Sequence, residues 1–224
     1  MDLEVVHVFI DDDGRHGNAL GIVDAASVPP KDYQYIAARS GLATTVFVDM
    51  PTDGSDSARA SIFGPETEFA FAGQSVVGLA WWLIERGYPI DTVHVSAGPV
   101  EIRQSGKLTW AKTLAEWAPH FSLVPLETPK DVANTRARDY PANPHYVWAW
   151  ADKLDYRVRA RMFARELGIE EDEATGAAAV RLTAALRHAL LIEQGKGSVL
   201  HTMFGTRGWI EIGGRVRAGR TRTL

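Results

Sequence analysis

Short apolar runs, separated by glycine, proline and acidic residues, dominate the first half of the chain. Their β-branched and aromatic side chains predict strands, which we place over 3–10, 17–23, 44–48, 58–63, 93–95 and 100–103. Residues 31–40 have the spacing of a short helix. The segment 72–86 is apolar on all sides and stops at Gly87, so it predicts a helix buried in a core.

The second half repeats this alternation, with a looser middle. Strands are expected over 108–112, 146–150, 199–204, 209–212 and 215–218. Residues 119–144 hold five of the eleven prolines and predict irregular structure. Residues 158–167 fit either a helix or a strand that runs into one, and residues 174–191 predict a second apolar helix.

The two apolar helices share a pattern. A constant offset of 103 residues aligns Gly73 with Gly176, and with them the apolar positions that follow. This spacing predicts an internal repeat the size of a lobe, although two helix starts rich in small residues can also match by chance. The repeat favours an α+β fold of two pseudo-symmetric lobes, each a curved, mostly antiparallel sheet wrapped around its central helix. We place the lobes at residues 1–105 and 106–224, with the final strands free to cross back.

Each of these helices begins at a glycine, which has two explanations. Gly73 and Gly176 let another backbone or a ligand approach closely, and the free N–H groups at a helix start attract anions. Two such starts facing each other across a cleft would hold a small carboxylate. Alternatively, the two glycines only relieve crowding in the core.

The composition excludes several classes of function. Lys and Arg number 24 against 28 Asp and Glu, and the net charge of −4 gives no electrostatic reason to bind DNA or RNA. The absence of cysteine excludes disulfides, thiolate metal ligands and a cysteine nucleophile, and is consistent with a reducing compartment. No signal peptide is evident, and the longest apolar stretch, 76–84, is too short to span a bilayer. We therefore expect a cytoplasmic protein without nucleic-acid or membrane partners.

The histidines and tryptophans offer no separate site. The seven histidines are scattered without metal-ligand spacing. His201 follows a glycine-rich turn and could approach the cleft, but a histidine packed within a strand is the favoured interpretation. Trp81 and Trp82 lie inside the first apolar helix, where we expect them to pack in the core.

Four sequence motifs follow one another along the chain. Residues 17–20 (GNAL) resemble the pattern GNPL, and residues 63–74 (FGPETEFAFAGQ) resemble FTPxxELPFAGH. Residues 171–178 (EDEATGAA) resemble EDPATGSA, and residues 193–197 (EQGKG) resemble EQG. In identity and order they resemble the motifs of the PhzF-like family, which has the diaminopimelate-epimerase fold. The resemblance implies a homodimer that acts on a small carboxylated metabolite without a metal or an organic cofactor.

The resemblance also implies a catalytic set. The best-known family member isomerises a dihydro-hydroxyanthranilate in phenazine biosynthesis, with a glutamate as base and a His, an Asp and a Ser in the same cleft. The matching positions here are Thr44 for the glutamate, Gln74 for the histidine, Ala177 for the serine and Asp172 for the aspartate. The candidate catalytic residues are Thr44, Gln74 and Asp172. The candidate substrate-binding residues are Asn18, Thr45, Gly73, Ser75, Gly176 and Ala177.

Three of the four catalytic positions are therefore substituted. Thr44 and Gln74 have no pKa near neutrality, so neither acts as a general base, and the thiols of the related epimerases are absent. One hypothesis is an isomerase-family enzyme with altered chemistry, in which orientation and electrostatics replace the base. The other is an inactive member that binds a ligand or a protein partner. Asp172 itself has a second interpretation, as an ordinary cap or dipole partner of the helix that follows.

Overall fold

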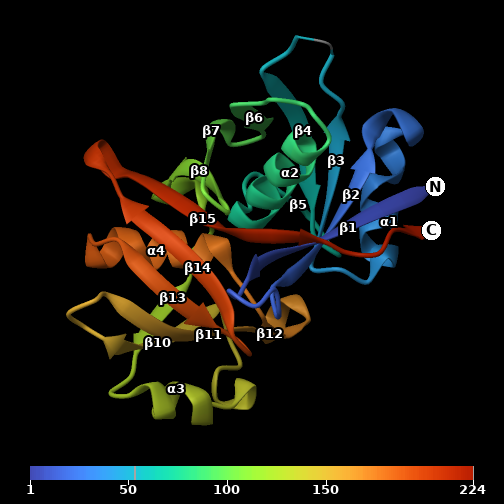
Figure 1. Cartoon of the computed structure of the whole chain (residues 1–224). Helices are drawn as coiled ribbons and strands as arrows, with labels where there is room; N and C mark the ends of the chain where they lie inside the picture. The colour runs from blue at the N-terminus through green and yellow to red at the C-terminus, as the bar shows by residue number, and fades with distance from the viewer. Residues whose placement is uncertain (53, 224) are drawn as a thin grey trace.

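The computed structural model describes residues 1–52 and 54–223, which form an α+β fold with a mixed sheet and four α-helices (Figure 1). The predicted α+β class is confirmed. The first half comprises β1 (Asp2–Ile10), β2 (Asn18–Asp24), α1 (Tyr33–Ser40), β3 (Thr44–Asp49), β4 (Ser57–Phe63), β5 (Glu68–Phe69), α2 (Gly73–Glu85), β6 (Thr92–Val95), β7 (Gly98–Ser105) and β8 (Leu108–Leu114). The second half comprises β9 (Ser122–Pro125), α3 (Pro129–Asn134), β10 (His145–Asp152), β11 (Arg157–Ala164), β12 (Ile169–Asp172), α4 (Gly176–Leu186), β13 (Leu190–Gln194), β14 (Ser198–Phe204), β15 (Trp209–Ala218) and β16 (Arg222–Thr223). Within these described residues, we find no helix with the length and apolar character needed to cross a membrane.

Eight strands close into a ring around α2. They follow the order β1–β2–β3–β4–β6–β7–β8–β15, and β15 pairs back onto β1 to complete the circle. The helix is buried along most of its length because its residues are small or apolar on nearly every side. Val77, Leu79 and Leu83 are at most 1% exposed, and burying each such side chain stabilises the fold by about 1.5–3 kcal/mol. The ring therefore holds the start of α2 in a fixed position.

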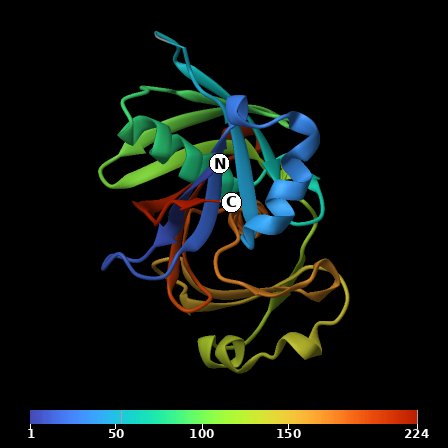
Figure 2. The same ribbon diagram turned by 90° about the vertical axis from the view of Figure 1, so that its right-hand side faces the viewer.

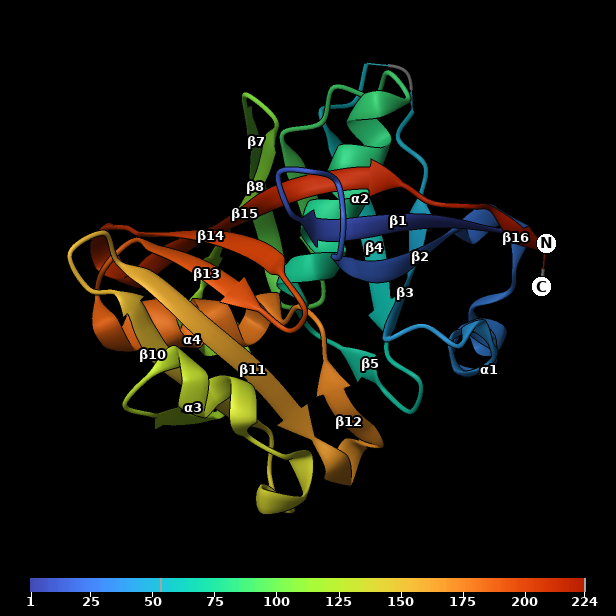
Figure 3. The same ribbon diagram turned by 60° about the horizontal axis from the view of Figure 1, so that its bottom comes forward.

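The strand β15 also leads into an open part of the same sheet. It pairs with β14, and the order continues through β13, β11 and β10 to β9. Figure 3 shows β15 running from β14 past α2 to β1. The helix α4 packs against β14 and β15, and α3 packs against β10 and β11 at the far end of the molecule from α2 (Figure 2). The two termini lie side by side, where β16 pairs with β1.

The same succession of elements occurs twice. It is β2–α1–β3–β4–β5–α2–β6–β7 in the first half and β9–α3–β10–β11–β12–α4–β13–β14 in the second. The strand pairings correspond as well. The pairs β2–β3 and β4–β6 in the first half are parallel, and so are β9–β10 and β11–β13 in the second. The pairs β4–β5 and β11–β12 are both antiparallel. A duplicated arrangement of this kind is what an internal repeat produces.

Among the stretches that differ from the expectations are the second apolar helix and residues 119–144. The helix predicted over 174–191 ends at Leu186, because Arg187 adopts a left-handed conformation (φ 59°) and the chain then turns into β13. Residues 119–144, predicted as irregular, contain β9 and α3, and a capping box at Thr128 starts α3. The proline-rich composition therefore led to an expectation of irregular structure where β9 and α3 form.

Candidate active site at the meeting of two helix starts

The first turns of α2 and α4 lie in direct contact. A Cβ atom built on Gly176 would lie 3.0 Å from the backbone nitrogen of Gln74, and one built on Gly73 would lie 3.5 Å from the carbonyl carbon of Gly176. Glycine allows two backbones to approach this closely because it has no side chain. The two helix starts therefore come together as predicted, whereas the cleft expected between them stays a prediction. Crowding between them accounts for both glycines without a ligand, so anion binding there stays a prediction.

Both helix starts keep free N–H groups. Neither Ala72 nor Thr175, the residues that precede the two helices, caps the first turn with its side chain. Among the described residues, no acceptor is found for the two N–H groups that follow Gly73 or for the two that follow Gly176. Unpaired N–H groups and the positive end of a helix dipole both favour an anion.

Asp172 is held beside the start of α4 by two donors. The side-chain amide of Asn18, at the beginning of β2, donates to its Oδ1 at 2.6 Å, and the hydroxyl of Thr175 donates to its Oδ2 at 2.6 Å. Burial raises the pKa of the Asp172 carboxyl to about 6, although the two hydrogen bonds lower it, and the neighbouring Glu173 and Glu171 add to the increase. A carboxyl with this pKa can donate and accept a proton near neutrality.

The ordinary helix-cap interpretation does not describe Asp172. Its oxygens accept from the side chains of Asn18 and Thr175, and the structure gives the first turn of α4 no side-chain cap. The carboxyl is thus positioned by residues on both sides of the junction between the two halves.

Gln194 ties this carboxyl to the second half of the chain. It is fully buried. Its Oε1 accepts from the backbone N–H of Thr175 (3.1 Å) and from the hydroxyl of Tyr146 (3.0 Å). Its Nε2 donates to the backbone oxygen of Asp172 and to the hydroxyl of Thr175, both at 2.9 Å. Sequence reasoning assigned no role to Gln194 or Tyr146, although the EQG motif contains Gln194 and could have pointed to it.

The hydroxyls of Thr44 and Ser75 are buried without partners. No hydrogen-bonding group reaches either of them within the described part of the chain, and Thr44 is 7% and Ser75 0% exposed. Leaving a hydroxyl in this state costs about 1–3 kcal/mol, and an unsatisfied buried group is a place where a water or a ligand fits. Gln74 is also buried, and its Nε2 donates to the backbone oxygen of Ala19 at 3.3 Å.

Thr45 faces away from this site. Its hydroxyl donates to Ser40, at the end of α1, at 3.2 Å. Successive residues of a strand point to opposite faces, and in β3 Val46 packs in the core around α2 while Phe47 packs under α1. Thr45 shares the face of Phe47. The substrate-binding role predicted for Thr45 is therefore corrected, because its side chain fastens α1 to the sheet.

The strand interpretation of His201 is confirmed. It lies in β14, and its ring meets that of Trp110 edge-on, with 6.2 Å between the centroids. Burial lowers the pKa of His201, so the imidazole is neutral at pH 7.

Comparison with known proteins now decides the family. The sequence profile of the phenazine biosynthesis-like proteins (PhzC-PhzF) matches residues 6–141, which is more than half of the chain. The chain belongs to the PhzF family. One relative, antisense-enhancing sequence 1 of Schizosaccharomyces pombe (strain 972), is 37% identical over 76 residues, which are 34% of this chain and only 26% of that protein's length.

Solved structures extend the similarity over the whole fold. A PhzF-family phenazine biosynthesis protein from Enterococcus faecalis superposes with a TM-score of 0.78 at 19% identity, covering 100% of this chain and 99% of that one. A hydroxyproline epimerase from Agrobacterium vitis, with bound trans-4-hydroxy-L-proline, superposes with a TM-score of 0.65 at 14% identity, covering 99% and 91% of the two chains. At these identities the likeness shows a shared fold.

The four PhzF-like motifs converge on the helix starts. Segments that are distant in sequence meet around one carboxyl, as the hydrogen bonds above describe. The motifs 17–20, 63–74, 171–178 and 193–197 carry, in that order, Asn18, the start of α2, Asp172 and Gln194.

Proposed function

We propose that this PhzF-family chain is a cofactor-independent, isomerase-type enzyme for a small cyclic carboxylated metabolite in biosynthesis. Its chemistry differs from that of its relatives because the usual general base is replaced by Thr44. The carboxylate of the substrate would lie against the free N–H groups of the two helix starts. Asp172 would transfer the proton, with Thr44 and Gln74 as polar neighbours of the substrate.

The observation that carries this proposal is the environment of Asp172. A carboxyl with a pKa of about 6 is largely ionised at pH 7 and can take a proton from a carbon next to the substrate's carboxylate. The same group, now protonated, can exchange its proton with solvent and deliver a proton to another carbon of the ring. One acid–base group is enough for this shift, because the same carboxyl removes one proton and supplies the other. Asn18 and Thr175 support it by fixing the orientation of the carboxyl.

The relatives support the class of substrate. The Agrobacterium vitis epimerase holds trans-4-hydroxy-L-proline, a small cyclic amino acid with a carboxylate. We also propose that the two repeated units are lobes divided near residue 105, with β15 and β16 returning to the first. The family resemblance further leads us to propose a homodimer.

A catalytically inactive binding protein is the second candidate. It is favoured by the side chains of Thr44, Gln74 and Ala177, which bring no acid or base to the site. The free N–H groups of the helix starts depend on the backbone and survive these substitutions. Such a chain would keep its affinity for a small ligand, or hold a protein partner, and lose its turnover.

Deuterium exchange separates the two candidates. The full chain is incubated in D₂O with trans-4-hydroxy-L-proline, L-proline and 1-cyclohexene-1-carboxylate, and proton NMR follows the loss of the ring C–H signals near the carboxylate. The proposed enzyme exchanges at least one of them, and Asp172→Asn abolishes the exchange while Asp155→Asn, an exposed control, does not. Binding without exchange supports the inactive candidate, and exchange that survives Asp172→Asn contradicts the role of Asp172.

A further inference from the structure

A second candidate site lies away from the helix starts. A cavity of about 360 Å³ opens between the turn after β1, the last turns of α2, the β7–β8 turn and β15. Its aromatic wall, Trp81, is eight residues beyond Gly73, which places it about 12 Å further along the helix axis. The volume is within the range of small-molecule sites, about 300–1,000 Å³. None of the residues proposed above for the active site lines this cavity.

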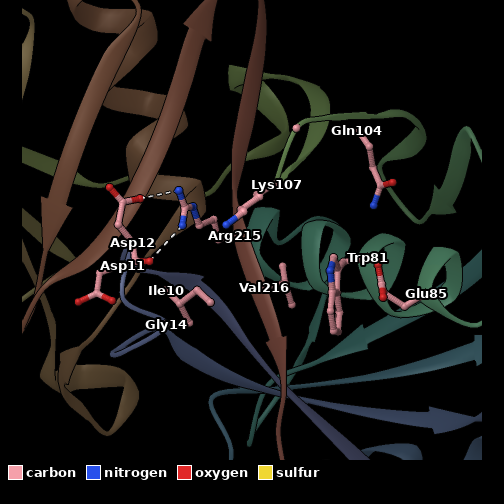
Figure 4. A pocket seen from close by; sticks show the side chains of 11 residues that line it. Ile10, Asp11, Asp12, Gly14, Trp81, Glu85, Gln104, Lys107, Arg215 and Val216 are labelled. Carbon is pink, nitrogen blue, oxygen red and sulfur yellow. Dashed lines mark hydrogen bonds and ion pairs between the residues drawn. The ribbon is translucent and has the colours of Figure 1, made fainter.

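Two unpaired charges of opposite sign line the cavity. Arg215 is neutralised by Asp12, whose Oδ1 lies 2.8 Å from the guanidinium and whose backbone oxygen accepts a second hydrogen bond at 3.2 Å. Lys107 and Glu85 are exposed and form no ion pair within the described part of the chain. Figure 4 shows Lys107 and Arg215 on one side of the hollow, and Trp81 with Glu85 on the other.

The indole of Trp81 supplies an apolar surface beside Glu85. The sequence led us to expect Trp81 in the core, but it is only half-buried and lines the cavity. An aromatic face attracts a cation, and so does the negative end of a helix dipole. Glu85 is the last residue of α2, so its carboxylate lies at the helix end, on the same side of the cavity as the indole of Trp81. This side of the cavity therefore favours an ammonium group, whereas the Lys107 side favours a carboxylate.

We propose that this cavity binds a small zwitterion with an aromatic or apolar body. The ligand's carboxylate pairs with Lys107, its ammonium pairs with Glu85, and its body lies on Trp81. The amide of Gln104, at the rim, supplies an additional hydrogen-bonding group. This site is independent of the proposed proton transfer at Asp172.

The test uses three probes with the same phenyl body. L-phenylalanine carries both charges, 3-phenylpropanoate carries only the carboxylate, and 2-phenylethylamine carries only the ammonium. Isothermal titration of the full chain should give L-phenylalanine an affinity about fivefold above either of the others. Lys107→Gln should remove its advantage over 2-phenylethylamine, Glu85→Gln its advantage over 3-phenylpropanoate, and Trp81→Leu should weaken all three probes.

Matched controls keep the test specific. Lys153→Gln and Glu116→Gln alter exposed residues that do not line the cavity and should leave the affinity unchanged. Asp172→Asn should also leave it unchanged, which separates this site from the proposed active site. The proposal is overturned if no probe binds at millimolar concentration, if the three cavity variants bind L-phenylalanine as wild type does, or if Asp172→Asn abolishes binding.

Discussion

Asn18 and Asp172 lie 154 positions apart in the sequence, and a 2.6 Å hydrogen bond joins their side chains. Asn18 begins β2 in the ring around α2, whereas Asp172 ends β12 beside the start of α4. A donor bonds more strongly to a carboxylate than to a neutral carboxylic acid. The ionisation of Asp172 is therefore coupled to the contact between the two halves of the fold.

Replacing Asp172 with Asn should change how stability depends on pH. The fold raises the pKa of Asp172 from its ordinary value of 3.8 to about 6, so the folded protein keeps this proton to higher pH than the unfolded chain does. The stabilisation from this proton is complete below about pH 4 and is lost as the pH rises through about 6, amounting to about 3 kcal/mol at most. Asp172→Asn should therefore gain stability relative to wild type as the pH rises from about 4 to about 7.

Urea unfolding at a series of pH values measures this difference. Asp155→Asn, an exposed change in the β10–β11 turn, serves as control and should follow wild type throughout. A difference between wild type and Asp172→Asn that stays constant with pH would mean that the pKa of Asp172 is not raised.

The contact between the two helix starts predicts an asymmetry between two alanine substitutions. A methyl group on Gly176 would lie 3.0 Å from the backbone nitrogen of Gln74, whereas one on Gly73 would lie 3.3 Å from a methyl group of the Ile212 side chain and 3.5 Å or more from the backbone of Gly176. Gly176→Ala should therefore lower the free energy of unfolding by about 1–3 kcal/mol, and Gly73→Ala by less than about 1 kcal/mol. Chemical denaturation of the two variants checks this order, and equal losses would contradict the geometry.

Gln194 should be among the most sensitive polar positions. Gln194→Leu leaves the N–H of Thr175 and the hydroxyl of Tyr146 without their buried acceptor, at a cost of about 3 kcal/mol. Gln104→Leu, at an exposed position near the end of β7, should change stability by less than about 0.5 kcal/mol. Thermal unfolding of both variants provides the comparison, and similar melting temperatures would show that the Gln194 network is not stabilising.

The repeated core could be predicted from the sequence because a buried element needs apolar or small residues along its whole length. The apolar helix predicted over 72–86 is α2, and the matching pattern 103 residues later identified the start of α4. The strands predicted over 209–212 and 215–218 are instead one strand, β15. The pair Gly213 and Gly214 suggested a turn, but the rings of Trp110 and Phe9 lie on these glycines within the sheet. The sequence alone does not distinguish a glycine that makes room for an aromatic ring from a turn glycine, because the ring belongs to a distant strand.

Only the site residues that lie within the four motifs could be predicted from the sequence. Asn18, Gln74 and Asp172 were singled out by their motif positions, and the structure places each of them at the helix starts or bonded beside them. Thr45 was misplaced because the face of a strand is decided by what packs on it, here α1. Tyr146 lies outside the motifs, and its hydrogen bond to Gln194 depends on a pairing between distant strands.

Restoring two family residues should shift the chain toward the parent reaction. Wild type should not isomerise the dihydro-hydroxyanthranilate at the rate of its relatives, because Thr44 cannot act as a base. Thr44→Glu combined with Gln74→His should give measurable turnover in a chromatographic assay of the product. The matched control is Thr44→Gln with Gln74→His, which keeps the shape of both new side chains but lacks the glutamate carboxylate, and should stay inactive. Rapid turnover by wild type would show that the base lies elsewhere.

The central claim is that the two helix starts together form a site for a small carboxylate, and an NMR titration tests it most directly. Benzoate is added to the ¹⁵N-labelled chain, with benzyl alcohol as the uncharged control, and the backbone amide signals of Gln74, Ser75, Ala177 and Ala178 are followed. We predict that all four shift together with one dissociation constant for benzoate and do not shift for benzyl alcohol. If the four signals stay in place at saturating benzoate, or if only one helix responds, the account is contradicted.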